Sequence, residues 1–250
     1  MLMGQIAENR CYTLGRLFSR NLISSTNKKK QKMSEGKIEL FNCDNMELMA
    51  KYPDKHFDLA IVDPPYGIDM DGGKIGIDGA GKAKQYTKYD WDKKAPDKAY
   101  FDELQRVSKN QIIWGANHFI ERINKNSSCW LVWDKNKVGG YFADAELAWT
   151  SFDTAVRTFK WTWHGFIQQN MSKKQERIHP TEKPIQLKQW ILQNYAKEGD
   201  LILDTHLGSA SIAIACHREK FSLVGCELVK EYYDNGLKRL ENEQMQTTLF

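Results

Sequence analysis

The sequence predicts an α/β fold built on a doubly wound, mostly parallel sheet. Short apolar runs alternate with longer segments of helical periodicity, which is typical of parallel strands joined by helical crossovers. One run ends at Asp63-Pro64-Pro65-Tyr66, where two prolines prevent further strand pairing. A second run ends at Asp204 and leads into a glycine-containing turn, the arrangement that open α/β sheets use for nucleotide-like ligands.

The expected elements follow from these patterns in chain order. The first strand is expected at 37–41, and Asp44 is a suitable N-cap for a helix at 45–51. Apolar or alternating runs of strand length mark further strands at 57–62, 111–114, 129–133, 153–160, 200–204 and 222–226. Apolar residues with helical spacing mark further helices at 99–107, 184–196, 209–219 and 229–241.

Composition bounds the class of protein. The chain has 250 residues, of which 41% are hydrophobic and 12% aromatic, so residues 33–250 are expected to form one domain with a full core. No apolar run reaches the length of a membrane span. The five cysteines show no CxxC spacing, which favours free thiols in a reducing compartment. We therefore expect a cytoplasmic protein that associates with neither a membrane nor a metal.

Residues 1–32 are expected to form a disordered basic extension. They hold seven basic residues and one acidic residue, a net charge of +6, which leaves −2 for the rest of a chain of total charge +4. Two alternatives are a transit peptide and a basic arm that contacts phosphates. Because the body is nearly neutral, any nucleic-acid-binding surface on it must be a local patch.

Residues 63–66 are expected to form a stiff shelf at the carboxyl end of strand 57–62. The prolines fix their own φ and push each preceding residue toward an extended conformation. The Asp63 carboxylate and the Pro64 carbonyl supply acceptors, and the Tyr66 ring supplies a stacking face. These groups suit a flat aromatic amine. The structural alternative is a proline-rich turn after a core strand.

A second candidate site lies between strands 200–204 and 222–226. Asp204, Gly208 and Ser209 form a strand–turn–helix unit in which backbone amides can approach a ligand closely. His206 either contacts that ligand or is a partly buried imidazole. Glu227 ends the next strand, where an acid typically accepts two ribose hydroxyls. Its alternative role is that of an acid at a helix start.

Three segments resemble motifs of the amino-group DNA methyltransferases, which methylate adenine N6 or cytosine N4. Residues 63–66 resemble the catalytic motif, and residues 179–184 resemble the segment before the helix that closes over S-adenosylmethionine. Residues 201–211 resemble the cofactor-binding strand and loop. The catalytic motif precedes the cofactor motif, an order similar to that of the circularly permuted beta class. The resemblance spans roughly residues 37–241.

The resemblance implies the class I S-adenosylmethionine-dependent methyltransferase fold. In that fold a seven-stranded, mostly parallel sheet contains one antiparallel strand near an edge. It also implies S-adenosylmethionine as cofactor, double-stranded DNA as substrate, and a bacterial or phage-encoded enzyme, for which a homodimer is one option. By the same resemblance, Asp44 would accept from the adenine amino group of the cofactor, and Thr181 and Lys183 would face its methionine carboxylate.

Within the family, Asp at position 63 more often accompanies adenine N6 and Ser accompanies cytosine N4. The expected reaction is therefore N6 methylation of a flipped adenine, without a metal. The alternatives are an N4-cytosine enzyme, an RNA or protein amino methyltransferase, and an inactive nucleic-acid-binding relic. The sequence departs from the common family form at Thr205, His206 and Ala210, where Pro-Phe and a second Gly are usual.

Two segments with little regular pattern are expected to contact DNA. Residues 68–98 are rich in Gly and Lys and directly follow the shelf, so we expect them to close over a flipped base. Residues 161–178 interleave aromatic, amide and basic side chains, which stack on bases, read base edges and bind phosphates. The alternative for each is a solvated loop. The candidate DNA contacts are Lys74, Lys82, Lys84, Trp161, Trp163, His164, Gln168, Gln169, Lys173 and Lys174.

Overall fold

The computed structural model describes residues 36–71, 73–75, 84–139, 143–164 and 167–247. The expected basic extension at 1–32 lies outside the described residues, as does Lys82. The strands of the main sheet are β1 (Ile38–Asn42), β2 (Phe57–Val62), β5 (Ser108–Trp114), β6 (Trp130–Asp134), β7 (Ala145–Thr150), β8 (Arg157–Lys160), β11 (Leu201–Asp204) and β12 (Ser222–Glu227). Two hairpins lie outside that sheet, β3 (Gly73–Ile75) with β4 (Lys84–Tyr86) and β9 (Trp163–His164) with β10 (Ile167–Gln168).

The helices alternate with the strands as expected. They are α1 (Asn45–Met49), α2 (Lys98–Val107), α3 (Ile120–Ile123), α4 (Ile185–Tyr195), α5 (Ser211–Glu219) and α6 (Lys230–Thr247), with 3-10 turns η1 (Ala116–His118) and η2 (Met171–Lys173). All five expected helices are present, and α6 continues to Thr247 instead of ending at 241. Asp44 is the N-cap of α1, since its Oδ1 accepts hydrogen bonds from the backbone N–H groups of Met46 and Glu47 at 2.7 and 3.2 Å.

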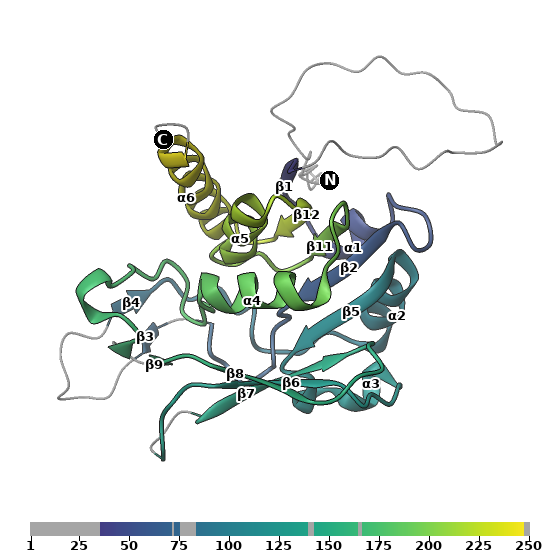
Figure 1. Cartoon of the computed structure of the whole chain (residues 1–250), viewed down its shortest axis with the longest axis horizontal. Coiled ribbons are helices and arrows are strands. Elements are labelled where there is room, and N and C mark those ends of the chain that lie inside the picture. Colours follow the sequence, from purple (N-terminus) through teal and green to yellow (C-terminus); the bar gives the residue numbers. More distant parts are fainter. Residues whose placement is uncertain (1–35, 72, 76–83, 140–142, 165–166, 248–250) are drawn as a thin grey trace, which may run out of the picture.

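The sheet order is β1-β12-β11-β2-β5-β7-β6-β8 (Figure 1). The strands run parallel except for β7, which is antiparallel to both β5 and β6. The expected fold class and single antiparallel strand near an edge are confirmed. The described part of the sheet nevertheless has eight strands, not the expected seven. The strand that the expected residue ranges omit is β7, whose Ala-Glu-Leu-Ala sequence is neither strictly alternating nor rich in β-branched residues.

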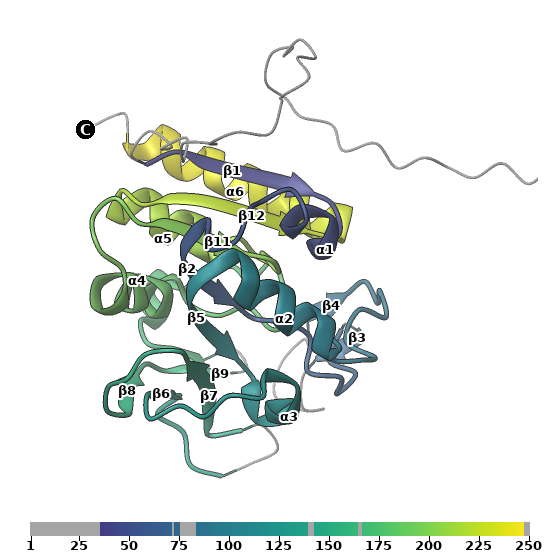
Figure 2. The ribbon, with the colours of Figure 1, turned by 90° about the vertical axis from the view of Figure 1, so that its right-hand side faces the viewer.

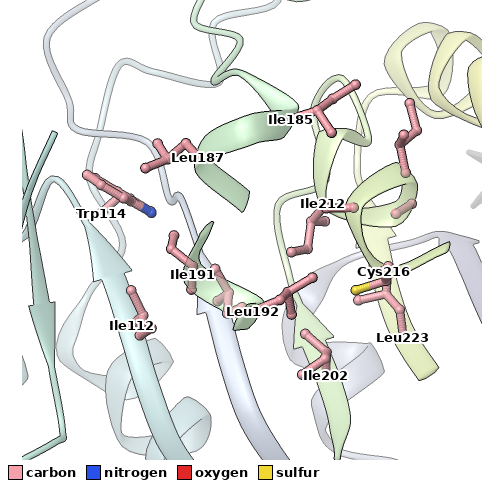
Figure 3. Packing of buried hydrophobic residues seen from close by; sticks show 14 of the residues in the cluster. Ile112, Trp114, Ile185, Leu187, Ile191, Leu192, Ile202, Ile212, Cys216 and Leu223 are labelled. Carbon is pink, nitrogen blue, oxygen red and sulfur yellow. The ribbon is translucent and has the colours of Figure 1, made fainter. Parts of the chain in front are cut away.

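Helices cover both faces of the sheet, as the edge-on view shows (Figure 2). On β2, Leu59 and Ile61 belong to the hydrophobic cluster that includes α4 and α5, whereas Ala60 and Val62 belong to the cluster that includes α1 and α2. Successive residues of a strand point to opposite faces, so a strand between two helical layers must be apolar throughout. The side chains of α4 and α5 meet the sheet in Figure 3.

The topology gathers polar residues at one edge of the sheet. Strands β12, β11 and β2 are parallel neighbours, so their carboxyl ends lie side by side. These ends carry Glu227, Asp204 and, one residue beyond β2, Asp63. Ligands of open α/β sheets bind at this edge. No helix in the described ranges is long and apolar enough to cross a membrane.

Candidate functional site

A cavity of about 1450 Å³ opens along the carboxyl edge of the sheet. Its lining follows the strand order, from Asp44 after β1 through Glu227 and Asp204 to Asp63 after β2. Glu146, the second residue of the antiparallel strand β7, also lines the cavity. The two sites that were expected separately from the sequence therefore share one cavity.

The carboxylate of Asp63 is held by two neighbouring side chains. The Tyr66 hydroxyl donates to Asp63 Oδ1 at 2.8 Å, and the Lys183 ammonium donates to Oδ2 at 2.5 Å. Lys183 Nζ also lies 3.0 Å from the Tyr66 oxygen, and its side chain is only 4% exposed. Lys183 was expected beside a methionine carboxylate. The structure places its ammonium group against Asp63 and Tyr66 in the lining of the shared cavity, and its contact with the cofactor stays a prediction.

Glu146 completes this cluster, and the sequence did not predict it. Its Oε2 lies 3.0 Å from Lys183 Nζ and accepts from the Tyr66 hydroxyl at 3.5 Å, while its Oε1 pairs with Lys135 at 2.6 Å. Burial alone would raise the pKa of Glu146, but Lys183 and Lys135 together lower it to about 2. Burial opposes the charge on Lys183 too, yet Asp63 and Glu146 raise its pKa. The sequence signal was a lone acid in the apolar run Ala-Glu-Leu-Ala-Trp.

Backbone geometry fixes the ring of Tyr66. Gly115, which follows β5, has a φ of +68°, and a Cβ placed there would lie 2.0 Å from Tyr66 Cε1. Only glycine permits this contact, because any other residue would collide with the ring and adopt a strained backbone. His118 in η1 stacks on Tyr66 with ring centroids 5.0 Å apart and planes 15° apart. A flat ligand that stacks on that face of Tyr66 has to displace His118.

At the β12 end of the cavity, Glu227 ties two loops together. Its Oε2 accepts from the backbone N–H of Gly208 at 2.8 Å, and its Oε1 accepts from the N–H of Val229 at 2.9 Å. Burial raises the pKa of this carboxyl group. Each carboxylate oxygen has two lone pairs, so both can still accept from hydroxyl groups of a bound ligand. The residues present therefore fit a ribose diol, and the role at the helix start holds at the same time.

Asp204 is buried between the two ends of the cavity. Burial raises its pKa to about 7, although the nearby Lys188 ammonium opposes that shift. Asp204 Oδ1 accepts from the backbone N–H of His206 at 2.9 Å. The His206 ring contacts Asn45 Nδ2 at 3.0 Å through Nε2 and Thr205 Oγ1 at 3.0 Å through Nδ1. Burial lowers its pKa to about 4, so the imidazole is neutral and held by protein groups while it lines the cavity.

The loop between β11 and α5 is compact and partly strained. Gly208 has a φ of +50°, and a Cβ placed there would lie 3.4 Å from the ring of His179. Ala210 also has a left-handed backbone, with a φ of +55°. That conformation costs about 1–2 kcal/mol for a residue with a Cβ and explains why glycine suits the position. Ser209 contributes an Oγ that lies 2.9 Å from Ser211 Oγ, and Thr181 Oγ1 lies 3.2 Å from His179 Nδ1.

Part of the segment 161–178 points into the protein. Trp163 is 4% exposed and donates through its indole N–H to the Glu182 carbonyl at 2.8 Å. Gln168 is 5% exposed, and its amide exchanges two 2.8 Å hydrogen bonds with the backbone of Gln175. Trp161 packs against the hydrophobic core cluster. These three side chains hold the segment in shape, and Trp163 and Gln168 also line the cavity.

Other DNA-contact candidates lie on the surface or at the cavity. Lys173 and Lys174 are exposed, and Lys174 and the half-buried His164 line the cavity. Burial lowers the pKa of His164. Gln169 Oε1 accepts from the Thr162 N–H at 3.0 Å. The remaining candidates, Lys74 and Lys84, lie in the paired strands β3 and β4. Within the described ranges, no three His, Cys, Asp or Glu side chains form a group that could hold a metal ion.

The sequence of this chain is similar to those of known DNA methyltransferases. Residues 109–238 match a family model described as DNA methylase. The chain is 26% identical over 200 residues to the type II methyltransferase M.HhaII of Haemophilus parahaemolyticus, covering 74% of this chain and 88% of that protein. It is 25% identical over 257 residues to the type II methyltransferase M2.DpnII of Streptococcus pneumoniae, covering 84% of this chain and 92% of that protein.

Solved structures share the fold. The M1.HpyAVI–SAM complex superposes with a TM-score of 0.50 at 22% identity, covering 81% of this chain and 100% of that chain. The PvuII DNA methyltransferase, described as cytosine-N4-specific, superposes with a TM-score of 0.53 at 12% identity, covering 83% of this chain and 90% of that chain.

Proposed function

Because this chain belongs to the amino-group DNA methyltransferases, we propose that it methylates the N6 amino group of an adenine flipped out of double-stranded DNA. The family takes its methyl group from S-adenosylmethionine, whose sulfonium centre makes that methyl group electrophilic. One observation carries the proposal. The Asp63-Pro64-Pro65-Tyr66 shelf and the Glu227 carboxylate line the same cavity. A methyl donor held by Glu227 and a flat amine held on the shelf could therefore meet there.

Adenine is favoured over cytosine by the Asp at position 63. Ser at this position more often accompanies cytosine N4 within the family. The alternative is an N4-cytosine enzyme, since the same fold occurs in a methyltransferase described as cytosine-N4-specific. Both amines need the same two acceptors, so the motif supports either reaction and the choice depends on the shape of the pocket around the base.

We assign the β1–β12–β11 side of the cavity to the cofactor. Glu227 would accept from the ribose hydroxyls, and Asp44 from the adenine amino group. Asp44 can do this while it caps α1, because a carboxylate has more lone pairs than the two capping bonds use. Asp204 and Thr181 line the same cavity and would face the methionine portion. Gly208, Ser209 and His206 would shape the loop around it.

The chemistry requires positioning and electrostatic stabilisation. An exocyclic amine is a poor nucleophile because its lone pair is delocalised into the ring. If Asp63 and the Pro64 carbonyl accept from its two N–H groups, the lone pair localises on nitrogen and points at the incoming methyl group. The N–H becomes acidic once the new bond forms, so Asp63 does not have to be a strong base. Stacking on Tyr66 would hold the base in plane.

We propose that DNA contacts come from the exposed part of 161–178 and from the β3–β4 region. Lys173 and Lys174 would bind phosphates, while His164, which lines the cavity, and the exposed Gln169 would face the bases. Lys74, Lys82 and Lys84 remain candidates for contacts with the phosphates of the DNA strand that would cross the cavity. Trp161, Trp163 and Gln168 would act indirectly, by holding the segment that carries those contacts.

The decisive experiment measures transfer of a labelled methyl group. DNA, RNA and protein are incubated in parallel with labelled cofactor, and the labelled DNA is hydrolysed to nucleosides. We expect label in DNA alone, as N6-methyladenine. Recovery of N4-methylcytosine would establish the alternative reaction. Absence of label from DNA, with label in RNA or protein, would overturn the proposal.

A further inference from the structure

Both carboxylate oxygens of Asp63 are already engaged in this structure. Oδ1 accepts from Tyr66 and Oδ2 accepts from Lys183. Each oxygen keeps a second lone pair, but a target amine that donates to Asp63 has to share the carboxylate with these donors unless one of them leaves. The Lys183 contact, at 2.5 Å between charged groups, is the stronger competitor. Asp63 therefore accepts most strongly from a target amine when the Lys183 ammonium has another partner.

We propose that Glu146 is a positioning residue that takes over the Lys183 ammonium when the target amine binds, and so frees Asp63 to accept from that amine. This inference rests on the proposed function, since it concerns the carboxylate assigned to the target base. Glu146 itself touches neither the base nor the cofactor in this scheme. It acts only through Lys183.

Lys183 has to move its ammonium group only a short distance to change partners. Lys183 Nζ lies 2.5 Å from Asp63 Oδ2 and 3.0 Å from Glu146 Oε2, so it already contacts both carboxylates. Lys183 is 4% exposed, and a buried ammonium group that loses its only counter-charge is strongly destabilised. With Glu146 present, Lys183 can leave Asp63 and remain paired. Without Glu146, it has to stay on Asp63.

Glu146 is also anchored from its other side. Lys135 pairs with Oε1 at 2.6 Å, and Lys135 is itself only 13% exposed. The carboxylate therefore keeps its place while Lys183 shifts. The two lysines lower the pKa of Glu146 to about 2, which keeps it ionised near neutral pH. Two lysines and two carboxylates balance in charge, and a neutral amine leaves that balance unchanged.

The topology explains why this residue comes from β7. The parallel strands present their carboxyl ends to the cavity, but β7 runs the opposite way and presents its beginning. Glu146 is the second residue of β7, which β5 separates from β2 in the sheet, whereas Lys183 lies in the segment before α4. Two elements distant in the sequence thus meet beside Asp63.

The test compares Glu146→Gln with Glu243→Gln. Glu243 is a matched control because it is also partly buried, 18% exposed against 21%, and ion-paired, to Arg218 at 2.7 Å, but lines no part of the cavity. We expect Glu146→Gln to lower the single-turnover rate of methyl transfer about tenfold or more, the scale of one hydrogen bond to a charged group. Cofactor affinity should stay within about twofold of wild type. Glu146→Asp, which keeps the charge, should retain most of the rate.

A second comparison separates this role from a structural one. In a Lys183→Met background no ammonium competes for Asp63, so adding Glu146→Gln should change the rate by less than about twofold. An equal loss in both backgrounds, or equal rates for wild type and Glu146→Gln, would overturn the inference. If Glu146→Gln lowers cofactor affinity and melting temperature along with the rate, Glu146 is a structural residue and the inference is wrong.

The same assay keeps the two proposals apart. The rate counts all label transferred to DNA, whichever base receives it. A wild-type enzyme that labels no DNA contradicts the proposed function. A wild-type enzyme that labels DNA, with an unchanged Glu146→Gln variant, contradicts only the role of Glu146.

Discussion

Asp63 offers two oxygens to three donors, namely Tyr66, Lys183 and the proposed target amine. Tyr66 and Lys183 occupy those oxygens in this structure, and the proposed reaction needs one of them for the target amine. The residue is also part of a charge cluster, so its removal affects more than one contact. Glu146 lies 3.0 Å from Lys183, so we expect it to keep that buried ammonium paired when Asp63 is replaced.

We therefore expect Asp63→Ala to fold and to bind cofactor with nearly wild-type affinity while losing methyl transfer. Loss of a preorganised acceptor costs about 3 kcal/mol in the barrier, which is roughly a hundredfold in rate. Calorimetric titration with cofactor and a turnover assay measure the two effects separately. Asp58→Asn, at the start of the same strand, is the control. Turnover above a tenth of the wild-type rate would contradict the assignment of Asp63.

Glu227 is expected to act on binding instead. Glu227→Gln keeps the shape of the side chain but removes the charge that accepts from ribose hydroxyls. A hydrogen bond to a charged group contributes about 1.5–3 kcal/mol, so the cofactor dissociation constant should rise roughly ten- to a hundredfold. Equilibrium dialysis or calorimetry measures it. An unchanged constant would leave Glu227 with only its bonds to Gly208 and Val229.

At the scale of elements, α6 packs closely on the loop between β11 and α5. Gly236 lies within α6, where glycine is about 1 kcal/mol less favourable than alanine. The reason is contact: a Cβ on Gly236 would lie 2.9 Å from the Cβ of Ala210. The small residues on the two elements set the distance between α6 and the proposed cofactor loop.

Gly236→Ala should therefore destabilise the protein in spite of its higher helix propensity. Overpacking typically costs about 1–3 kcal/mol. In an Ala210→Gly background the clash is absent and the left-handed backbone is relieved, so the same Gly236→Ala change should be neutral or stabilising. Melting temperatures of the four proteins give the comparison, at about 2–4 °C per kcal/mol for a chain of this size. The same sign for Gly236→Ala in both backgrounds would contradict the packing argument.

At the scale of the whole molecule, buried titratable groups make stability depend on pH. The pKa of Asp204 is about 7 in the folded protein and 3.8 as a model value. Between these values the folded state holds a proton that the unfolded state has lost, so stability falls as pH rises toward 7. Burial lowers the pKa of both His179 and His206 to about 4, and these two groups remove stability as pH falls below about 6.5.

A difference measurement isolates the contribution of Asp204. Asp204→Asn keeps an acceptor for the His206 N–H and removes the titration, while both histidines remain. The stability of wild type relative to Asp204→Asn should decrease from pH 5 to pH 8. Urea unfolding at intervals of one pH unit measures both proteins. A constant difference across this range would mean that Asp204 does not titrate there.

The sequence by itself determined the fold class and the two ends of the cavity. Continuous apolar runs alternating with helices require a parallel sheet, and the carboxyl ends of parallel strands meet at one edge whatever the loops do. Asp63, Asp204 and Glu227 could be placed for that reason, because each directly ends or follows a strand. The Asp44 cap was predictable because capping is a local interaction.

Only the tertiary structure decided which side chains meet inside the cavity. Glu146 and Lys183 come from different elements, and no local pattern states that they share Asp63. Gln168 was predicted from its residue type to read bases; the fold also pairs its amide with the backbone of Gln175 in the cavity lining, which no local pattern states. A buried polar group requires a hydrogen-bonding or ionic partner, but several residue types could supply one. Which residue does so depends on how elements distant in the sequence pack together. Residue type therefore predicts the chemistry at this edge, and packing decides which residues carry it.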